Sequence, residues 1–283
     1  MRVIELSNHP GDMLNEVSRR RRAAQSRAQD EYEDALIQHQ ARVQTLRVKR
    51  DQARQHHQWW TWLRLAFAAW AGKRRAPAKP VPDRDDTDAG TEERIRAGIA
   101  GERLVAAELG QALGDDWTLL TGYRNRRGEI DHLLLGPGGL YAIEVKNINA
   151  TMHVDGDRWR ADKYDNYGNL VEQWLVADRR GRSPSEQLSE PAADLERFLH
   201  GRGQAVTIQR VVVLTHRRSR LGVIRNPTVN VATSTGDVLS LVRDSAGQLG
   251  ERQLGERQLG ERQRAEVQRL ILRDHSFHDR GRR

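Results

Sequence analysis

The stretch GEIDHLLLGPGGLYAIEVKN runs from Gly128 to Asn147 and predicts two apolar strands around a Gly-Pro-Gly-Gly turn. Apolar strands of this kind are usually covered on both faces of a sheet. This pair nevertheless carries four charged side chains: Glu129, Asp131, Glu144 and Lys146. Burying several carboxylates near one another costs several kcal/mol each unless a cation neutralises them. The hairpin therefore predicts a cation close to these acids.

The length of the turn decides whether these charges meet. With an even-numbered loop centred between Pro137 and Gly138, Asp131 faces Glu144, and Glu129 faces Lys146. Because side chains alternate with a period of two, all four then share one face, with opposed Cβ atoms about 4.5–5.5 Å apart. An odd loop would send the two central acids to opposite faces. The even loop is the register that gathers the charges, and we adopt it as an assumption.

Two interpretations fit such a cluster. Carboxylate oxygens are the ligands that Mg²⁺ or Mn²⁺ prefers, which predicts a metal site. Alternatively, a buried lattice of ion pairs would balance the charges, with Glu129 bound to Lys146 and Asp131 bound to an arginine. Both stay open at this point.

The composition excludes several classes of protein. The chain of 283 residues has no cysteine, which excludes a disulfide framework, a thiol nucleophile and a cysteine zinc site. Its first residues lack the basic-then-apolar pattern of a signal peptide, and no apolar run reaches the roughly 18 residues that span a bilayer. These features predict a cytoplasmic protein.

The formal net charge of +8 is unevenly spread along the chain. Residues 1–80 carry the whole positive excess, whereas residues 81–283 hold equal numbers of basic and acidic side chains. Attraction to phosphate or to an anionic surface is therefore expected mainly of the N-terminal part.

Residues 1–75 are predicted to form a long basic helix, or a weak coiled coil, that ends in a tryptophan-rich segment. The sequence from Asp12 to Gln58 is polar and free of Pro and Gly. The segment WWTWLRLAFAAWAGKRR, residues 59–75, then places aromatic side chains beside a basic cluster. It predicts either a peripheral membrane contact or a packing surface through which the chain forms a homo-oligomer.

A proline-rich and then acidic linker, residues 76–91, precedes an α/β domain over residues 92–245. Residues 92–113 predict an amphipathic helix whose apolar stripe is interrupted by Glu102. Residues 246–283 form a tail that repeats Gln-Leu-Gly-Glu-Arg. We expect this tail to be flexible, with a short helix at 265–273.

A helix start is predicted near residue 183. Ser183 as N-cap, Pro184 at the first helical position and Glu186 at the third form a capping box. Pro191 is expected to kink or restart this helix, because proline removes a backbone donor and clashes with the preceding turn.

The order of these features resembles the PD-(D/E)XK nuclease arrangement and, more closely, the NERD (nuclease-related) domain. The resemblance covers about residues 96–215 and rests on four groups: Gly101-Glu102, residues 128–132, residues 143–147, and Ser183-Pro184 with Gln187. It implies an α/β fold, namely a restriction-endonuclease-like core with a mixed central sheet flanked by helices and preceded by the long N-terminal helix.

The resemblance implies a metal-dependent nuclease that hydrolyses phosphodiester bonds of DNA or RNA by a metal-activated water. Asp131 and Glu144 would bind one Mg²⁺ or Mn²⁺, with the Val145 carbonyl as a further ligand. Glu102 would complete the ligand set or hold a metal-bound water.

Two further side chains complete the expected catalytic set. Lys146 would orient the attacking water, help deprotonate it, or stabilise charge on the phosphoryl group. Gln187 would position a water or the phosphate. Basic residues nearby are candidate contacts to nucleic acid: Arg124, Arg126, Arg127, Arg217, Arg218 and Arg220.

Two other functional classes stay open. The domain could bind nucleic acid without cutting it, as a silent module that keeps the fold. Alternatively, the protein could act mainly as an interaction protein, at a membrane surface or in an oligomer, through its N-terminal helix.

Overall fold

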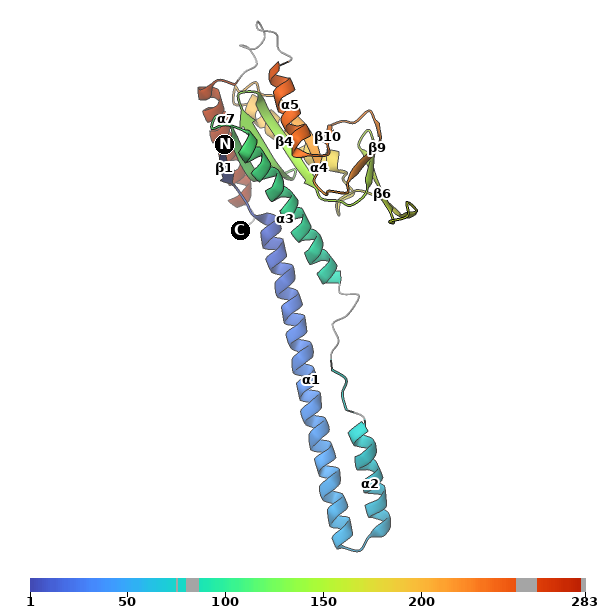
Figure 1. Ribbon diagram of the computed structural model, residues 1–283. Helices are drawn as coiled ribbons and strands as arrows, with labels where there is room; N and C mark the ends of the chain where they lie inside the picture. The colour runs from blue at the N-terminus through green and yellow to red at the C-terminus, as the bar shows by residue number, and fades with distance from the viewer. Residues whose placement is uncertain (75, 80–86, 248–258, 281–283) are drawn as a thin grey trace. The chain divides into compact units, whose positions relative to one another are not determined.

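The computed structural model describes residues 1–74, 76–79, 87–247 and 259–280 (Figure 1). In chain order the elements are β1 (Arg2–Glu5), α1 (His9–Gln55), α2 (Trp59–Arg74), α3 (Thr87–Ala112), β2 (Thr118–Arg124), β3 (Glu129–Gly136), β4 (Gly139–Lys146), β5 (Thr151–Asp155), β6 (Arg158–Tyr164), β7 (Leu170–Leu175), α4 (Pro184–His200), β8 (Ile208–Leu214), β9 (Arg220–Arg225), β10 (Asn230–Ala232), α5 (Thr235–Gly247) and α7 (Glu261–Arg280). The chain divides into two compact units, Met1–Asp12 with Ile95–Arg283, and Met13–Arg94.

The unit of residues 13–94 is helical. Most of the long helix α1 is solvated, and Ala53 is its one buried residue among those described. Gly72 of α2 lies against α1, where an added Cβ would be 3.7 Å from a methyl group of Val43. Near the other end of the unit, Ser18 donates to Glu92 at 3.0 Å. The predicted long helix is confirmed, whereas a coiled coil stays a prediction.

The helix α2 exposes much of its apolar surface. Its exposed large side chains are Trp59, Trp60, Leu63, Phe67 and Trp70. None of the described helices has the length and apolar character needed to cross a membrane. Membrane contact or self-association through residues 59–75 therefore stays a prediction.

The α/β unit is built on a six-stranded mixed sheet in the order β1-β2-β3-β4-β8-β10. The strands β2, β3 and β4 form an antiparallel meander, while β1, β8 and β10 join by parallel pairing. A second sheet of four strands, β7-β6-β5-β9, is smaller. A mixed sheet flanked by helices is the predicted fold class.

The β3–β4 hairpin has an even-numbered loop, as assumed from its sequence. Gly136 pairs with Gly139 across a two-residue loop, and His132 pairs with Ile143 farther along. Gly136 is required here because an added Cβ would lie 2.2 Å from the Trp117 ring. This register places Asp131 and Glu144 on the same face of the sheet.

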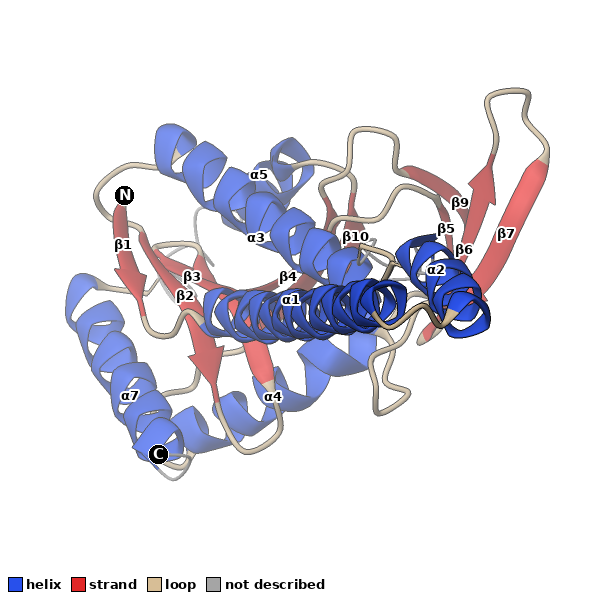
Figure 2. Ribbon diagram, turned by 90° about the horizontal axis from the view of Figure 1, so that it is seen from below, coloured by secondary structure: helices blue, strands red, loops and turns tan. Residues whose placement is uncertain are grey.

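Helices cover both faces of the large sheet (Figure 2). On one face, α3 and α5 pack on a core that includes Val105, Leu134, Ile143 and Val238. On the other face, α4 and α7 pack on a core that includes Leu133, Ala142, Leu195 and Ile271. Both faces of β3 and β4 are therefore buried, which explains the continuous apolar character of the hairpin.

Several features differ from the sequence-based expectation. The segment before α1 forms the edge strand β1, so Met1–Asp12 belong to the α/β unit and not to the N-terminal helical part. The helix α4 runs unbroken through Pro191, whose carbonyl accepts from Asn125. The C-terminal helix α7 is longer than predicted. Most of the Gln-Leu-Gly-Glu-Arg repeat lies outside the described residues.

Candidate active site

The helix α3 lies close to β4, and this contact positions Glu102. Gly101 lies where an added Cβ would be 2.6 Å from Thr215 Oγ1 and 3.3 Å from a methyl group of Val145. Only glycine permits this distance, because any other residue would push α3 away. The next residue, Glu102, is thereby held near the ends of β3 and β4. Its carbonyl accepts a hydrogen bond from His132 Nε2 at 3.1 Å.

His132 holds this contact as a neutral ring. Burial lowers its pKa to about 4, so at neutral pH the imidazole carries no charge. It points to the α3 face of the sheet, opposite to its neighbour Asp131. The histidine therefore ties β3 to α3 without adding a cation to the acid cluster.

Asp131, Glu144 and Lys146 share the face of the sheet that α4 covers, as the hairpin register requires. Asp131 Oδ2 accepts a hydrogen bond from the backbone N–H of Val145 at 2.7 Å. Glu144 is buried and binds Lys146 Nζ through Oε1 at 2.6 Å. The two acids thus lie beside each other, with a single ammonium group on one of them.

The carboxylates disturb one another. Burial, then repulsion by Glu144 and Glu102, raises the pKa of Asp131 well above its usual value. Burial, then Glu129 and Glu144, raises the pKa of Glu102 to about 7. Both pKa values are therefore raised first by burial and then by the neighbouring acids, and both carboxylates would gain from a nearby positive charge.

Lys146 keeps its charge in this environment. Burial alone would lower its pKa, but Glu144 and Asp131 outweigh burial and raise it. Besides binding Glu144, its Nζ donates to Gln187 Oε1 at 3.0 Å. Gln187 in turn donates from Nε2 to the Arg182 carbonyl at 2.7 Å. Both ends of the Gln187 amide are therefore engaged within the protein, and this side chain orients Lys146.

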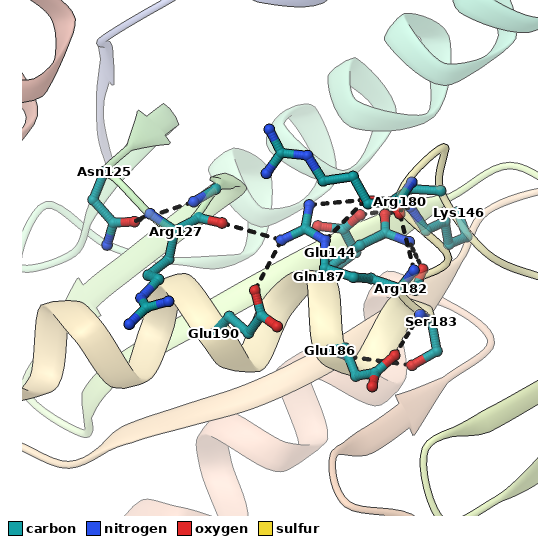
Figure 3. Close-up of polar contacts among 12 residues, drawn as sticks. Asn125, Arg127, Glu144, Lys146, Arg180, Arg182, Ser183, Glu186, Gln187 and Glu190 are labelled. Carbon is teal, nitrogen blue, oxygen red and sulfur yellow. Dashed lines mark hydrogen bonds and ion pairs between the residues drawn. The ribbon is translucent and has the colours of Figure 1, made fainter. Parts of the chain in front are cut away.

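Arg182 organises the loop that precedes α4 (Figure 3). Its guanidinium binds Asp178 at 2.8 Å, Glu190 at 3.1 Å and the Arg127 carbonyl at 3.1 Å. The following Ser183 starts α4 with the predicted capping box. Arg182 is not among the residues predicted from the sequence, although its place directly before the capping box is a usable signal.

An ion pair of Glu129 with Lys146, which the alternative interpretation of the hairpin required, is not found among the described residues. Glu129 instead binds Arg124 on β2, which lies directly opposite in the sheet, at 2.6 Å. No ion pair between Asp131 and an arginine is found among the described residues. The buried lattice considered for the hairpin is therefore wrong in its partners.

The candidate arginines fall into two groups. Arg124 and Arg126 are engaged in ion pairs, with Glu129 and Asp194 respectively. Arg220 donates to backbone carbonyls of its own loop. Arg127, beside Arg182, and Arg217 and Arg218, in the loop after β8, are exposed, and so are Arg126 and Arg220 despite their contacts. Contact of any of them with nucleic acid stays a prediction.

The donor set suits a hard divalent cation. Within the described part of the chain, no three His, Asp or Glu side chains are grouped tightly enough to hold a metal. Glu102 comes from the helix on the opposite face of the sheet, so Asp131 and Glu144 are the central pair. One or two carboxylates suffice for Mg²⁺, which keeps several of its waters. The position of two carboxylates side by side, with one ammonium group bound to Glu144, is the observation that favours a cation here.

Comparison with known proteins agrees with this geometry. Residues 97–215 match the family model of the nuclease-related domain, NERD. This range holds the helix end with Glu102, the charged hairpin, the start of α4 and the whole of β8. No curated protein and no solved structure matches the chain. The core of the α/β unit, residues 97–215, is therefore similar to the nuclease-related domain.

Proposed function

We propose that the domain of residues 97–215 hydrolyses phosphodiester bonds of DNA or RNA with the help of a bound divalent metal. The observation that carries this proposal is the pair of Asp131 and Glu144, whose charges outnumber the one ammonium beside them. A buried pair of this kind is costly without a cation. It is useful where a metal and a phosphate meet.

Asp131 and Glu144 would hold Mg²⁺ or Mn²⁺. The Val145 carbonyl would join them, since the N–H and C=O of one strand residue point to the same side and this N–H already faces Asp131. A bound metal of this type polarises a phosphoryl oxygen and lowers the pKa of water. Glu102, with its pKa raised to about 7, would accept or release a proton near the cluster.

Lys146 would act on the substrate as a fixed cation. Glu144 and Gln187 hold its Nζ in place from two sides. An ammonium in this position would stabilise negative charge on the phosphoryl oxygens and orient the attacking water. Because its pKa is raised, it is a poor proton acceptor at neutral pH. The orienting and electrostatic roles are therefore favoured over that of general base.

The direct test is a cleavage assay with single-stranded and double-stranded DNA and RNA, in Mg²⁺, Mn²⁺ or EDTA. We expect cleavage with metal and none in EDTA. Glu144→Gln should abolish cleavage, while Glu266→Gln, a change on α7 at a half-buried acid paired with Arg269, should leave it intact. Both variants are purified in the same way, so a contaminating nuclease would appear equally in both.

A silent binding module gives a different result. It would bind nucleic acid with the same affinity in wild type and in Glu144→Gln, and would cut with neither metal. That outcome would overturn the proposal and leave a nucleic-acid-binding function for the same fold.

A further inference from the structure

A pocket lined by charged and aromatic side chains lies away from the acid cluster, between α4 and α7. Its volume is about 640 Å³, within the roughly 300–1,000 Å³ typical of ligand sites. The lining residues come from the β2–β3 turn, from the second half of α4 and the loop after it, and from α7. None of the catalytic candidates contributes to it.

The charge of this pocket is positive. Four arginines line it: Arg126, Arg197, Arg202 and Arg273. Two acids also line it, Asp194, which binds the first two of these arginines, and Asp274, which binds Tyr123 and lies 3.6 Å from His278. Arg202 and Arg273 make no ion pair among the described residues. The pocket therefore offers two arginines to an anionic ligand.

Aromatic rings accompany the arginines. The guanidinium of Arg202 lies 5.1 Å from the centre of the Phe198 ring. Phe277 is 73% exposed, one of the most exposed large apolar side chains of the α/β unit. An exposed ring beside cationic side chains is the arrangement that stacks bases and binds the phosphates next to them.

The helix α4 connects this pocket to the active site. Gln187 and Phe198 are eleven residues apart on α4, which is close to three turns, so they lie on the same side of the helix, roughly 16 Å apart along its axis. The β2–β3 turn is fixed between them, with Asn125 bound to the Pro191 carbonyl and Arg126 bound to Asp194. A strand of nucleic acid that passes over this turn would reach both places.

We infer that the pocket between α4 and α7 binds single-stranded nucleic acid next to the segment that is cut. Phosphates contact Arg202 and Arg273, and an unpaired base stacks on Phe277. Bases within a duplex are already stacked on their neighbours, so a ring of this kind selects the single strand. The inference rests on the proposed function for the choice of nucleic acid as ligand.

The test measures binding of the full chain to a labelled single-stranded DNA of about 20 nucleotides in EDTA, so that no cleavage interferes. The double variant R202Q/R273Q should weaken binding about tenfold. The slope of the logarithm of the binding constant against the logarithm of the salt concentration should become shallower by about 0.7 for each lost phosphate contact. Phe277→Ala should weaken binding about tenfold with the salt dependence unchanged. Arg269→Gln, on α7 outside the pocket, is the matched control and should bind within twofold of wild type.

Three results would overturn the inference: wild type that does not bind the single strand, pocket variants that bind like Arg269→Gln, or equal losses with a duplex of the same sequence. Thermal melting of each variant identifies a loss caused by unfolding, and the conservative Phe277→Tyr should then restore binding if stacking matters. If wild type cuts nucleic acid but the variants bind normally, the inference fails while the proposed function stands. If the pocket variants bind more weakly but wild type cleaves nucleic acid with neither metal, the inference stands and the proposed function fails.

Discussion

Two aspartates of the α/β unit show how differently one side chain is treated within one fold. Asp194 on α4 is buried and accepts hydrogen bonds from Arg126 and Arg197, which hold its pKa below the usual value. Asp131 on β3 accepts one backbone N–H and faces Glu144, and burial with this repulsion raises its pKa.

The difference separates a carboxylate that stabilises the fold through ion pairs from a carboxylate that is available for chemistry. Two arginines bind Asp194, and these ion pairs stabilise the folded protein. At Asp131 the chain places acids instead, which costs stability and leaves room for a metal and a phosphate. Mutation of the two aspartates and of their neighbours, and the pH dependence of stability, test whether the two sites differ in this way.

The largest effect is expected from exchanging each aspartate for its neutral isostere. Asp131→Asn should lose cleavage by roughly 10³-fold or more, about 4 kcal/mol of transition-state stabilisation, because a metal ligand is removed. In EDTA its melting temperature should equal or exceed that of wild type, since a repelled carboxylate is gone. Asp194→Asn is the control and should cut at the wild-type rate. Equal cleavage rates for Asp131→Asn and Asp194→Asn would show that the two aspartates do not differ in their role in catalysis.

The next effect concerns the cations beside the two aspartates. Lys146→Ala should lose cleavage by roughly 10²-fold and keep nucleic-acid binding, the scale of a positioned catalytic group. Arg126→Ala, which removes a cation from Asp194 and lies away from the acid cluster, should keep its turnover at saturating substrate. Single-turnover rates of folded protein check both. If Lys146→Ala melts much earlier yet cuts normally, Lys146 has a structural role only.

The third effect is a pH dependence set by Glu102. Its pKa is raised to about 7 in the folded protein against 4.5 for the free side chain, so the folded state binds more protons between these values. Stability in EDTA should therefore fall as the pH rises from about 4.5 to 7, by about 2 kcal/mol, since solvent screens part of the repulsion.

Denaturant unfolding at several pH values measures this slope. Glu102→Gln should flatten it, and Glu108→Gln, an exposed acid on the same helix, should not. A wild-type profile that is level from pH 4.5 to 7 would mean that Glu102 is not held near the other acids.

The smallest effect has the opposite sign and belongs to Asp194. Its lowered pKa means that its contribution to stability is present above about 3.8 and is lost as the pH falls through the folded value. Asp194→Asn should therefore cost about 1 kcal/mol at pH 7, because its arginine partners reach solvent. The difference from wild type should vanish in acid. A constant difference down to pH 2 would assign the cost to packing and not to charge.

The features of the fold that could be predicted from the sequence depend mostly on local turn and helix-cap chemistry. The turn of the β3–β4 hairpin fixed the register, and with it the meeting of Asp131 and Glu144. The capping box at Ser183 is present in full. These features depend on residues a few positions apart, for which turn and cap chemistry is decisive.

Ion pairs and strand pairings between distant parts of the chain could not be predicted from the sequence. The partner of Glu129 is Arg124 and not Lys146, because the neighbouring strand β2 competes for it. The binding of Asp194 to Arg126 joins α4 to a distant turn, and no local spacing indicates it. The short strand β1 has too few residues to show a pattern. Pro191 was expected to disturb α4, yet packing on the sheet keeps the helix continuous.

The pairing of β1 with β2 has a consequence for the order of synthesis and folding. Arg2 pairs with Thr118, so the first strand leaves the ribosome about 116 residues before its partner exists. At roughly 5–20 residues per second, this interval is on the order of ten seconds. The contacts of a helix such as α1 are local and form within about a microsecond. We therefore expect the helical unit to form during translation while the outermost strand of the large sheet waits, unpaired, for its place.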